Sequence, residues 1–273
     1  MKISYGKLRV PLQRVVARPD GRHDLLACDV GVEVLGGNFA AAYTEGDNSA
    51  VVATDTMKNF ILREALAYEG DTLEGLLAFL GRRFLRTYAV MESVRMSGRE
   101  HRFDRLSDKL FVREHGDHAV ASVELDGDGV VHARSGREDL WLLKVTGSSF
   151  TRFARDDYTT LPERVDRPLF VRMDVWWRYA DPADAEDGER HVPSEAVREH
   201  LAATFDDFVS ESIQHLVHEM AGRMLDRWPQ LAEVRFEAEN HTRDPAGEDG
   251  ARKVYTAPFP AHGLITLTLD RGG

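Results

Sequence analysis

The sequence repeats itself once, at an offset of about 140 residues. The clearest matches are Arg83-Phe84-Leu85 with Arg223-Met224-Leu225, Val94-Arg95-Met96 with Val234-Arg235-Phe236, and His101 with His241. Like residues recur over a helical stretch and over the strand-like stretch after it, so the repeat unit is a half-chain domain and not a short solenoid repeat. We therefore predict two related domains, residues 1–137 and 138–273.

Each half shows the same order of strand and helix patterns. Alternating apolar residues predict strands, as over residues 26–34 in the first half and 171–179 in the second. Apolar residues at helical spacing then predict paired helices, of which those over 73–84 and 213–224 are the longer. Further strands follow in both halves. This order, found twice, predicts an α+β fold with antiparallel sheets and helices on one face only.

Such a fold leaves exposed surfaces that need partners. A sheet covered on one face keeps its other face and its edge strands open, and edge strands carry unpaired N–H and C=O groups. Further copies of the chain can cover both if the sheets close into a barrel. We therefore expect an oligomer.

Charge and apolar patterning exclude several classes of partner. The chain has 35 Lys and Arg against 46 Asp and Glu, a net charge of −11, which disfavours binding to phosphate backbones. Its apolar runs are shorter than the roughly 20 residues that span a bilayer, and the N-terminus lacks the apolar core of a signal peptide. We expect no nucleic-acid or membrane partner. The single cysteine, Cys28, lies in an alternating strand and is predicted to be buried.

Several short motifs place hydroxyl, carboxylate and cationic groups beside predicted strands and helices. Tyr5-Gly6-Lys7 lies near the N-terminus, and Ala53-Thr54-Asp55 ends an apolar run. Residues 150–167 mix aromatics, arginines and hydroxyls without a strand or helix period, a composition common in segments that line sites. Taken singly, these residues also have structural explanations, such as Phe150 in the core or Arg167 as an ion-pair partner of a neighbouring carboxylate.

Together and in this order, the motifs resemble those of the urate oxidases. In that family a Phe-x-x-Phe-x-x-Asp-x-Tyr-Thr-Thr-Leu segment ending in Asp-Arg matches residues 150–167, and a Ser-Ile-Gln motif matches Ser212-Ile213-Gln214. The resemblance covers nearly the whole chain. It implies tandem tunnelling-fold domains, assembled as a homotetramer with active sites at subunit interfaces. It also implies oxidation of urate by dioxygen and water to 5-hydroxyisourate and hydrogen peroxide, without cofactor.

The resemblance also implies roles for individual residues. Lys7 and Thr54 would abstract a proton from the substrate, with Thr54 and Asp55 reaching it from a neighbouring subunit. A lysine whose pKa is lowered can act as the base while a threonine hydroxyl relays the proton.

A second set of residues would hold the substrate. Urate is a flat anion, so its site needs an aromatic face, a cationic fork for one edge and an amide for the other. Phe150, Arg167 and Gln214 would supply these groups, and the main chain of Ile213 would add a contact at a helix N-terminus that favours an anion.

The match is less regular at the end of the second domain. Many urate oxidases have Asn-Lys-His where this chain has Asn240-His241-Thr242. Asn240 aligns and would hold the oxygen or water above the ring. His241 comes one residue early, and such a shift on a strand reverses the direction of the side chain. His241 is therefore a candidate relay, a supporting residue or simply an exposed one.

Two alternatives remain open. One is another tunnelling-fold enzyme acting on a pterin or purine, which would generally need zinc; the other is a catalytically silent purine-binding protein. His215 and His218 lie three apart on a helix, but no cysteine or third histidine at ligand spacing joins them, so we expect no metal site. The C-terminus lacks the peroxisomal signal of eukaryotic relatives, which favours a cytoplasmic enzyme.

Overall fold

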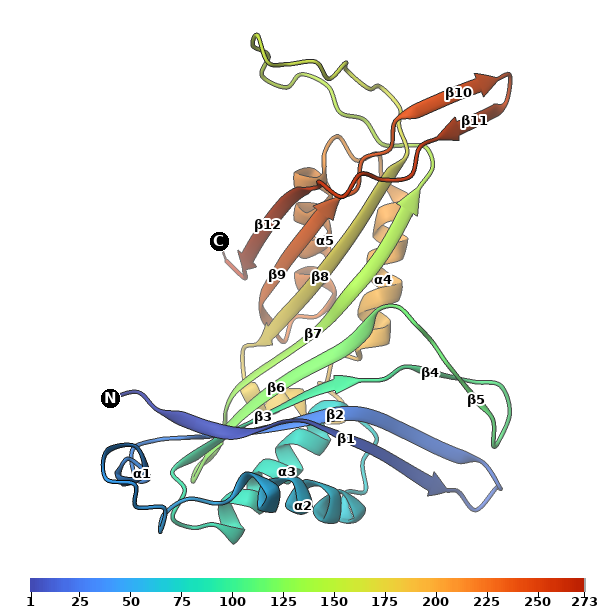
Figure 1. Ribbon diagram of the computed structural model, residues 1–273. Coiled ribbons are helices and arrows are strands. Elements are labelled where there is room, and N and C mark those ends of the chain that lie inside the picture. The colour runs from blue at the N-terminus through green and yellow to red at the C-terminus, as the bar shows by residue number, and fades with distance from the viewer. Residues whose placement is uncertain (273) are drawn as a thin grey trace. The chain divides into compact units, whose positions relative to one another are not determined.

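A computed structural model describes residues 1–272 of the protein (Figure 1). The chain forms two compact units: the first holds Met1–Gly136 and Arg178–Val192, and the second holds Arg137–Trp177 and the residues from Pro193 onward. The sequence repeat does not indicate that residues 178–192 belong with the first unit. The predicted domain boundary between residues 137 and 138 stays a prediction.

The first unit contains an antiparallel sheet with two main helices. In sheet order its strands are β1 (Ser4–Ala17), β2 (His23–Leu35), β3 (Ser93–Glu100) and β6 (His118–Asp126). Its helices are α1 (Ala41–Thr44), α2 (Thr54–Glu64), α3 (Leu73–Thr87) and the short 3-10 turns η1 (Ala65–Ala67) and η2 (Pro182–Ala185). A small hairpin of β4 (Phe103–Arg105) and β5 (Phe111–Arg113) stands apart from the sheet.

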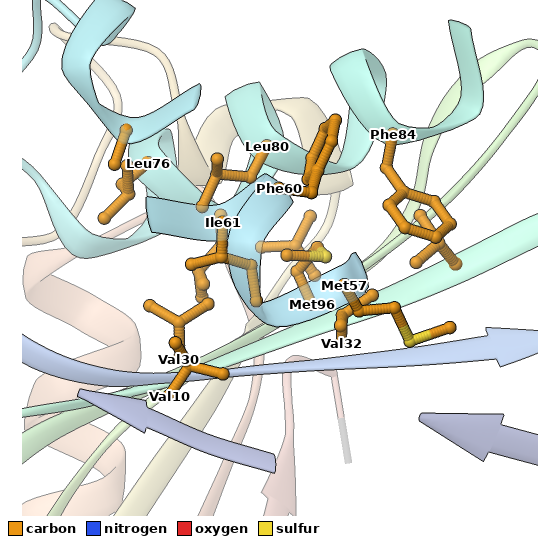
Figure 2. Packing of buried hydrophobic residues seen from close by; sticks show 14 of the residues in the cluster. Val10, Val30, Val32, Met57, Phe60, Ile61, Leu76, Leu80, Phe84 and Met96 are labelled. Carbon is orange, nitrogen blue, oxygen red and sulfur yellow. The ribbon is translucent and has the colours of Figure 1, made fainter. Parts of the chain in front are cut away.

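The core of this unit lies between the sheet and helices α2 and α3. Figure 2 shows the packing, with strand residues Val10, Val30, Val32 and Met96, α2 residues Met57, Phe60 and Ile61, and α3 residues Leu76, Leu80 and Phe84. Cys28 is fully buried in the same cluster, which confirms its predicted place. The other face of the sheet is polar, since Arg95 pairs there with Glu33 at 2.8 Å and Glu124 at 2.9 Å. This alternation shows a sheet covered on one face.

The second unit repeats this plan. In sheet order its strands are β7 (Gly129–Lys144) from residue 137 onward, β8 (Leu169–Tyr179) up to residue 177, β9 (Leu231–Asn240) and β12 (Gly263–Asp270). Its helices are α4 (Ser194–Asp207) and α5 (Ile213–Arg227), and a separate hairpin joins β10 (Pro245–Asp249) to β11 (Arg252–Tyr255). Along β8, Val171 and Met173 are buried while Arg172 and Asp174 lie on the other face.

The two long helices show the duplication most clearly. Helices α3 and α5 both have 15 residues. The side chain of Thr72 accepts a hydrogen bond from the N–H of Gly75 at 3.2 Å, and the side chain of Ser212 accepts one from the N–H of His215 at 3.0 Å. Both are N-caps that satisfy an otherwise unpaired N–H group of the first turn. The same residue pattern therefore begins the same helix in each half.

The predicted α+β class, with antiparallel strands and paired helices in each half, is confirmed. Within residues 1–272, no helix combines the length and the apolar character that crossing a bilayer requires.

Candidate active site

Lys7 lies on β1 directly before a distortion of the sheet. The preceding Gly6 is required by close packing, because a Cβ there would lie 2.0 Å from the carbonyl oxygen of Val32. The register between β1 and β2 shifts after Lys7, and Arg9 adopts a left-handed conformation with φ of 56°. Such a β-bulge re-aims the side chains beside it and is common next to active sites. The bulge could not be predicted from the sequence, because an arginine and not a glycine occupies its left-handed position.

Tyr5 connects this strand to the start of helix α2. Its hydroxyl accepts a hydrogen bond from the backbone N–H of Val52 at 2.8 Å. Thr54 is the first residue of α2, two positions after Val52, and its side chain is exposed. Tyr5 was not predicted to have a role of its own, yet this hydrogen bond ties the Tyr5-Gly6-Lys7 strand to the segment leading into Thr54.

Asp55 is an exposed carboxylate in the first turn of α2. It forms an ion pair with Lys58 at 2.5 Å and accepts a hydrogen bond from Asn59 at 3.2 Å. The hydrogen bond from Lys58 is the main reason that the pKa of Asp55 is lowered, and the positive charge of Lys7 adds a smaller effect. Lys7, Thr54 and Asp55 thus share one region of the first unit.

In the second unit, a pair of buried serines brings three segments together. The backbone N–H of Arg167 donates to the carbonyl of Ser148 at 2.8 Å, and the N–H of Ser149 donates to the carbonyl of Ser210 at 2.8 Å. The hydroxyl of Ser210 donates to that of Ser148 at 3.0 Å. These bonds join the segments that contain Phe150, Arg167 and the start of α5. The two serines were missed in the sequence, where nothing distinguishes them from other loop hydroxyls.

Phe150 and Arg167 form an aromatic and cationic surface. Phe150 stacks on Phe153 with ring centroids 5.0 Å apart and planes at 9°. The guanidinium carbon of Arg167 lies 5.3 Å from the centre of the Phe150 ring. This contact provides both a flat face and a positive charge.

The guanidinium of Arg167 lacks a protein partner where it is most buried. Its Nε is buried and has no hydrogen-bond acceptor among residues 1–272. Burial, with a smaller contribution from the charge of Arg164, lowers the pKa of Arg167. The neighbouring carboxylate of Asp166 instead accepts hydrogen bonds from Thr146 and from the N–H of Gly147, both at 2.8 Å. The alternative explanation of Arg167 as an ion-pair partner of Asp166 is therefore wrong.

Arg167 also lines a pocket of about 450 Å³ in the second unit. Asn240 and His241 line the same pocket, together with residues of the β10–β11 hairpin such as Lys253 and Tyr255. Phe150, Ile213 and Gln214 are not among its lining residues. Ile213 is buried at the start of α5, and the side chain of Gln214 is exposed one position later. The structure thus groups Arg167 with Asn240 and His241.

Asn240 is the last residue of β9, and His241 follows it directly. His241 Nε2 contacts Glu239 Oε2 at 2.9 Å, so these two side chains share the face that the helices leave open. The ring of His241 packs against Trp141 with centroids 4.8 Å apart, and its backbone N–H donates to the carbonyl of Phe170 at 3.0 Å. The direction of the His241 side chain is thus fixed by Glu239 and Trp141, and its role stays a prediction.

The family model, the relatives and the solved structures that this chain is similar to all belong to one family. The family model for uricase matches residues 4–127 and 133–266. A uricase of Haloferax volcanii is 43% identical over an alignment that covers 99% of this chain and 98% of the relative. A solved urate oxidase of Bacillus sp. TB-90 has a TM-score of 0.91 at 35% identity, covering 98% of this chain and 100% of that one. A solved uricase of Arthrobacter globiformis has a TM-score of 0.90 at 31% identity, covering 100% and 95%.

Proposed function

The chain belongs to the uricase family and is a urate oxidase, and we propose that its two groups of site residues complete each other between copies of the chain. The reaction takes urate, dioxygen and water to 5-hydroxyisourate and hydrogen peroxide. The tandem tunnelling-fold class expected from the resemblance agrees with the solved relatives. The oligomeric state, the barrel that it would close and the roles of individual residues belong to the proposal.

The observation that supports this site best is the half-buried guanidinium of Arg167, whose Nε is buried without an acceptor among residues 1–272. A buried charge without a counter-ion is costly unless a ligand supplies the missing charge and hydrogen bonds. Its contact with Phe150 at 5.3 Å adds an aromatic surface beside the cation. A flat anion such as urate satisfies both, because its ring stacks on Phe150 while its edge accepts hydrogen bonds from Arg167.

Gln214, Ile213 and Asn240 would complete the substrate contacts. Gln214 and Ile213 lie in the first turn of α5, where unpaired N–H groups and the helix dipole favour an anion. The amide of Gln214 would bind the edge of urate opposite to Arg167. Asn240, which lines the pocket with Arg167, would hold dioxygen or water above the ring. His241 would act as a relay at the edge of this pocket and not as the base.

Lys7 would act as the base, through the hydroxyl of Thr54. Proton removal makes urate electron-rich, so that the substrate itself can pass an electron to dioxygen. Thr54 and Asp55 are exposed in the first unit, as expected for groups that contact a substrate held by a neighbouring copy. This arrangement motivates the proposed homotetramer, in which further copies also cover the open sheet faces and edge strands. Catalysis without metal and a cytoplasmic location stay predictions.

Subunit complementation tests this arrangement. Thr54→Ala and Arg167→Ala chains are purified separately, mixed under conditions that exchange subunits, and assayed by loss of urate absorbance together with peroxide formation. If each site takes Thr54 from one chain and Arg167 from another, random mixing restores about a quarter of the sites. Each variant mixed with itself is the control. Rescue no greater than in these controls would contradict a shared site, and an unmixed wild-type chain that leaves urate unchanged would contradict the function itself.

A further inference from the structure

Three potential metal ligands converge on the open face of the second sheet. They are Glu239 and His241, at the end of β9, and His262, directly before β12. Glu239 Oε2 lies 2.9 Å from His241 Nε2 and 3.9 Å from His262 Nε2, and the three ligand atoms all lie within 4.8 Å of one another. The sequence did not suggest this group, because His262 joins it through the pairing of β9 with β12.

Neighbouring groups orient two of these ligands. Nδ1 of His262 lies 3.2 Å from the carbonyl oxygen of Pro260, which can only accept, so Nδ1 is the donor and Nε2 is the nitrogen that can bind a cation. The other oxygen of Glu239 accepts a hydrogen bond from Arg172 at 3.1 Å, which leaves Oε2 facing the two histidines. Outer contacts of this kind are typical of metal-binding histidines and carboxylates.

Glu239 belongs to a group of acidic side chains around Arg172. Arg172 contacts three carboxylates: Asp139 at 2.9 Å, Asp174 at 3.0 Å and Glu239 at 3.1 Å. One guanidinium cannot neutralise three carboxylates. Glu239 therefore shares its arginine with two other acidic side chains, while its Oε2 faces the two histidines.

We propose that Glu239, His241 and His262 bind one divalent cation of the zinc class. A tetrahedral zinc ion holds nitrogen and oxygen ligands at about 2.0–2.2 Å, which places neighbouring ligand atoms roughly 3.3–3.6 Å apart. The spacings of 2.9 and 3.9 Å from Glu239 to the two histidines bracket this range. Two imidazoles and one carboxylate favour zinc and similar borderline cations over magnesium or calcium, and they leave a fourth position open.

The site goes beyond the proposed function, because urate oxidation does not need it. It departs from the sequence-based expectation that the chain holds no metal. His241 also lines the pocket that contains Arg167, so a cation on its Nε2 would hold the ring away from the substrate. The cation would thus act as an inhibitor, and the loaded protein would oxidise urate more slowly than the metal-free protein.

Direct binding is the first test, on tag-free protein stripped with a chelator. Calorimetry should show one Zn²⁺ bound per chain and no binding of Mg²⁺. Co²⁺ should develop the visible absorption of a tetrahedral site. Because Trp141 packs on His241 at 4.8 Å, bound Co²⁺ should also quench its fluorescence, and Trp141→Phe should remove this quenching while binding persists.

Variants separate this site from adventitious binding. His262→Ala should lower Zn²⁺ affinity by more than about 100-fold and abolish inhibition by zinc, while its metal-free turnover stays that of the wild type. Glu239→Gln, which keeps the size of the side chain, should also lose the cation. His115→Ala, at an exposed histidine of the first unit, is the control and should bind zinc normally. Equal zinc binding by wild type, His262→Ala and Glu239→Gln would overturn the proposal. So would a protein that oxidises urate but binds no zinc, which leaves the proposed function intact.

Discussion

Helices α2 and α4 begin with corresponding residues, so candidate site residues of the first unit can be compared with their duplicates in the second. Helix α2 begins with Thr54 and Asp55, and α4 begins with Ser194 and Glu195, so a hydroxyl followed by a carboxylate opens both. The basic residues also correspond. Lys7 comes two residues before the left-handed Arg9 of β1, and Arg137 comes two residues before the left-handed Asp139 of β7, where φ is 63°. A lysine, a threonine and an aspartate in the first unit thus have an arginine, a serine and a glutamate as counterparts in the second.

The two sets of residues differ in the burial of their polar side chains and in the partners of these side chains. Arg137 is only 2% exposed, pairs with Glu195 at 3.1 Å and donates to the hydroxyl of Ser194 at 3.2 Å. In the first unit Thr54 and Asp55 are exposed to solvent. In the second set the side chains are thus paired with one another around a buried arginine. In the first set Thr54 is exposed, and Asp55 pairs with Lys58 and Asn59 of its own helix. One copy of the duplicated arrangement is therefore buried and paired, and the other, which we propose takes part in catalysis, is exposed.

The largest expected effect comes from giving Lys7 the side chain of its counterpart. Lys7→Arg keeps the positive charge, but a guanidinium does not deprotonate in proteins and cannot act as a base. We expect the single-turnover rate to fall by roughly 10²–10⁴-fold, as in Lys7→Ala, while a non-reactive oxopurine still binds. If Lys7→Arg keeps the wild-type rate, Lys7 contributes charge and not proton abstraction, and the functional contrast with Arg137 disappears.

Arg167 and Arg137 of the second unit provide the next test. Arg137 is buried and paired, whereas Arg167 is half-buried and its buried Nε has no acceptor among the described residues. Arg167→Met should weaken oxopurine binding by about 2–5 kcal/mol, because a charged contact with the ligand is lost. It should not lower the free energy of unfolding of the ligand-free protein, because an unpaired buried charge is removed. Titration calorimetry and denaturant unfolding measure the two quantities. A clear loss of stability would show that Arg167 has a structural role.

Arg137→Met should have the opposite profile. It removes a hydrogen-bonded ion pair whose guanidinium is buried but whose carboxylate is 48% exposed. The expected loss is therefore that of a charged hydrogen bond, about 1.5–3 kcal/mol in the free energy of unfolding, with little change in oxopurine affinity below the melting transition. Loss of affinity without loss of stability would mean that the duplicate set still takes part in binding.

The smallest effects concern the two equivalent helix caps. Thr72→Ala and Ser212→Ala should each cost about 1 kcal/mol of stability, since each removes a side-chain acceptor for an N–H of the first turn. Only Ser212→Ala should also weaken oxopurine binding, because Ile213 and Gln214 follow it directly. Equal binding by both variants would indicate that the start of α5 does not contact the substrate.

Local patterns predicted those parts of the structure that local forces determine. The periodicity of α3 and α5, the buried side of β2 and the place of Cys28 follow from apolar spacing alone. The bulge at Arg9 could not be predicted, because it depends on how β1 pairs with β2 and its left-handed residue is not a glycine.

Candidate site residues show the same limit. Arg167 could be named from its motif, but its lack of a partner depends on Asp166 binding Thr146 instead. The approach of His262 to Glu239 depends on strand pairing between residues distant in the sequence. The spacing of residues in the sequence does not predict such contacts between distant parts of the chain.

The buried position of Cys28 has a practical consequence for labelling. Burial, followed by the negative charges of Glu100 and Asp29, raises the pKa of its thiol to about 12. Thiol reagents attack the thiolate, so at ordinary pH they have neither access nor a reactive form to attack. Toward maleimide dyes or spin labels the native protein behaves as if it contained no cysteine. A cysteine introduced on the surface of either unit would be its only reactive thiol, so probes can be attached without first deleting a core residue.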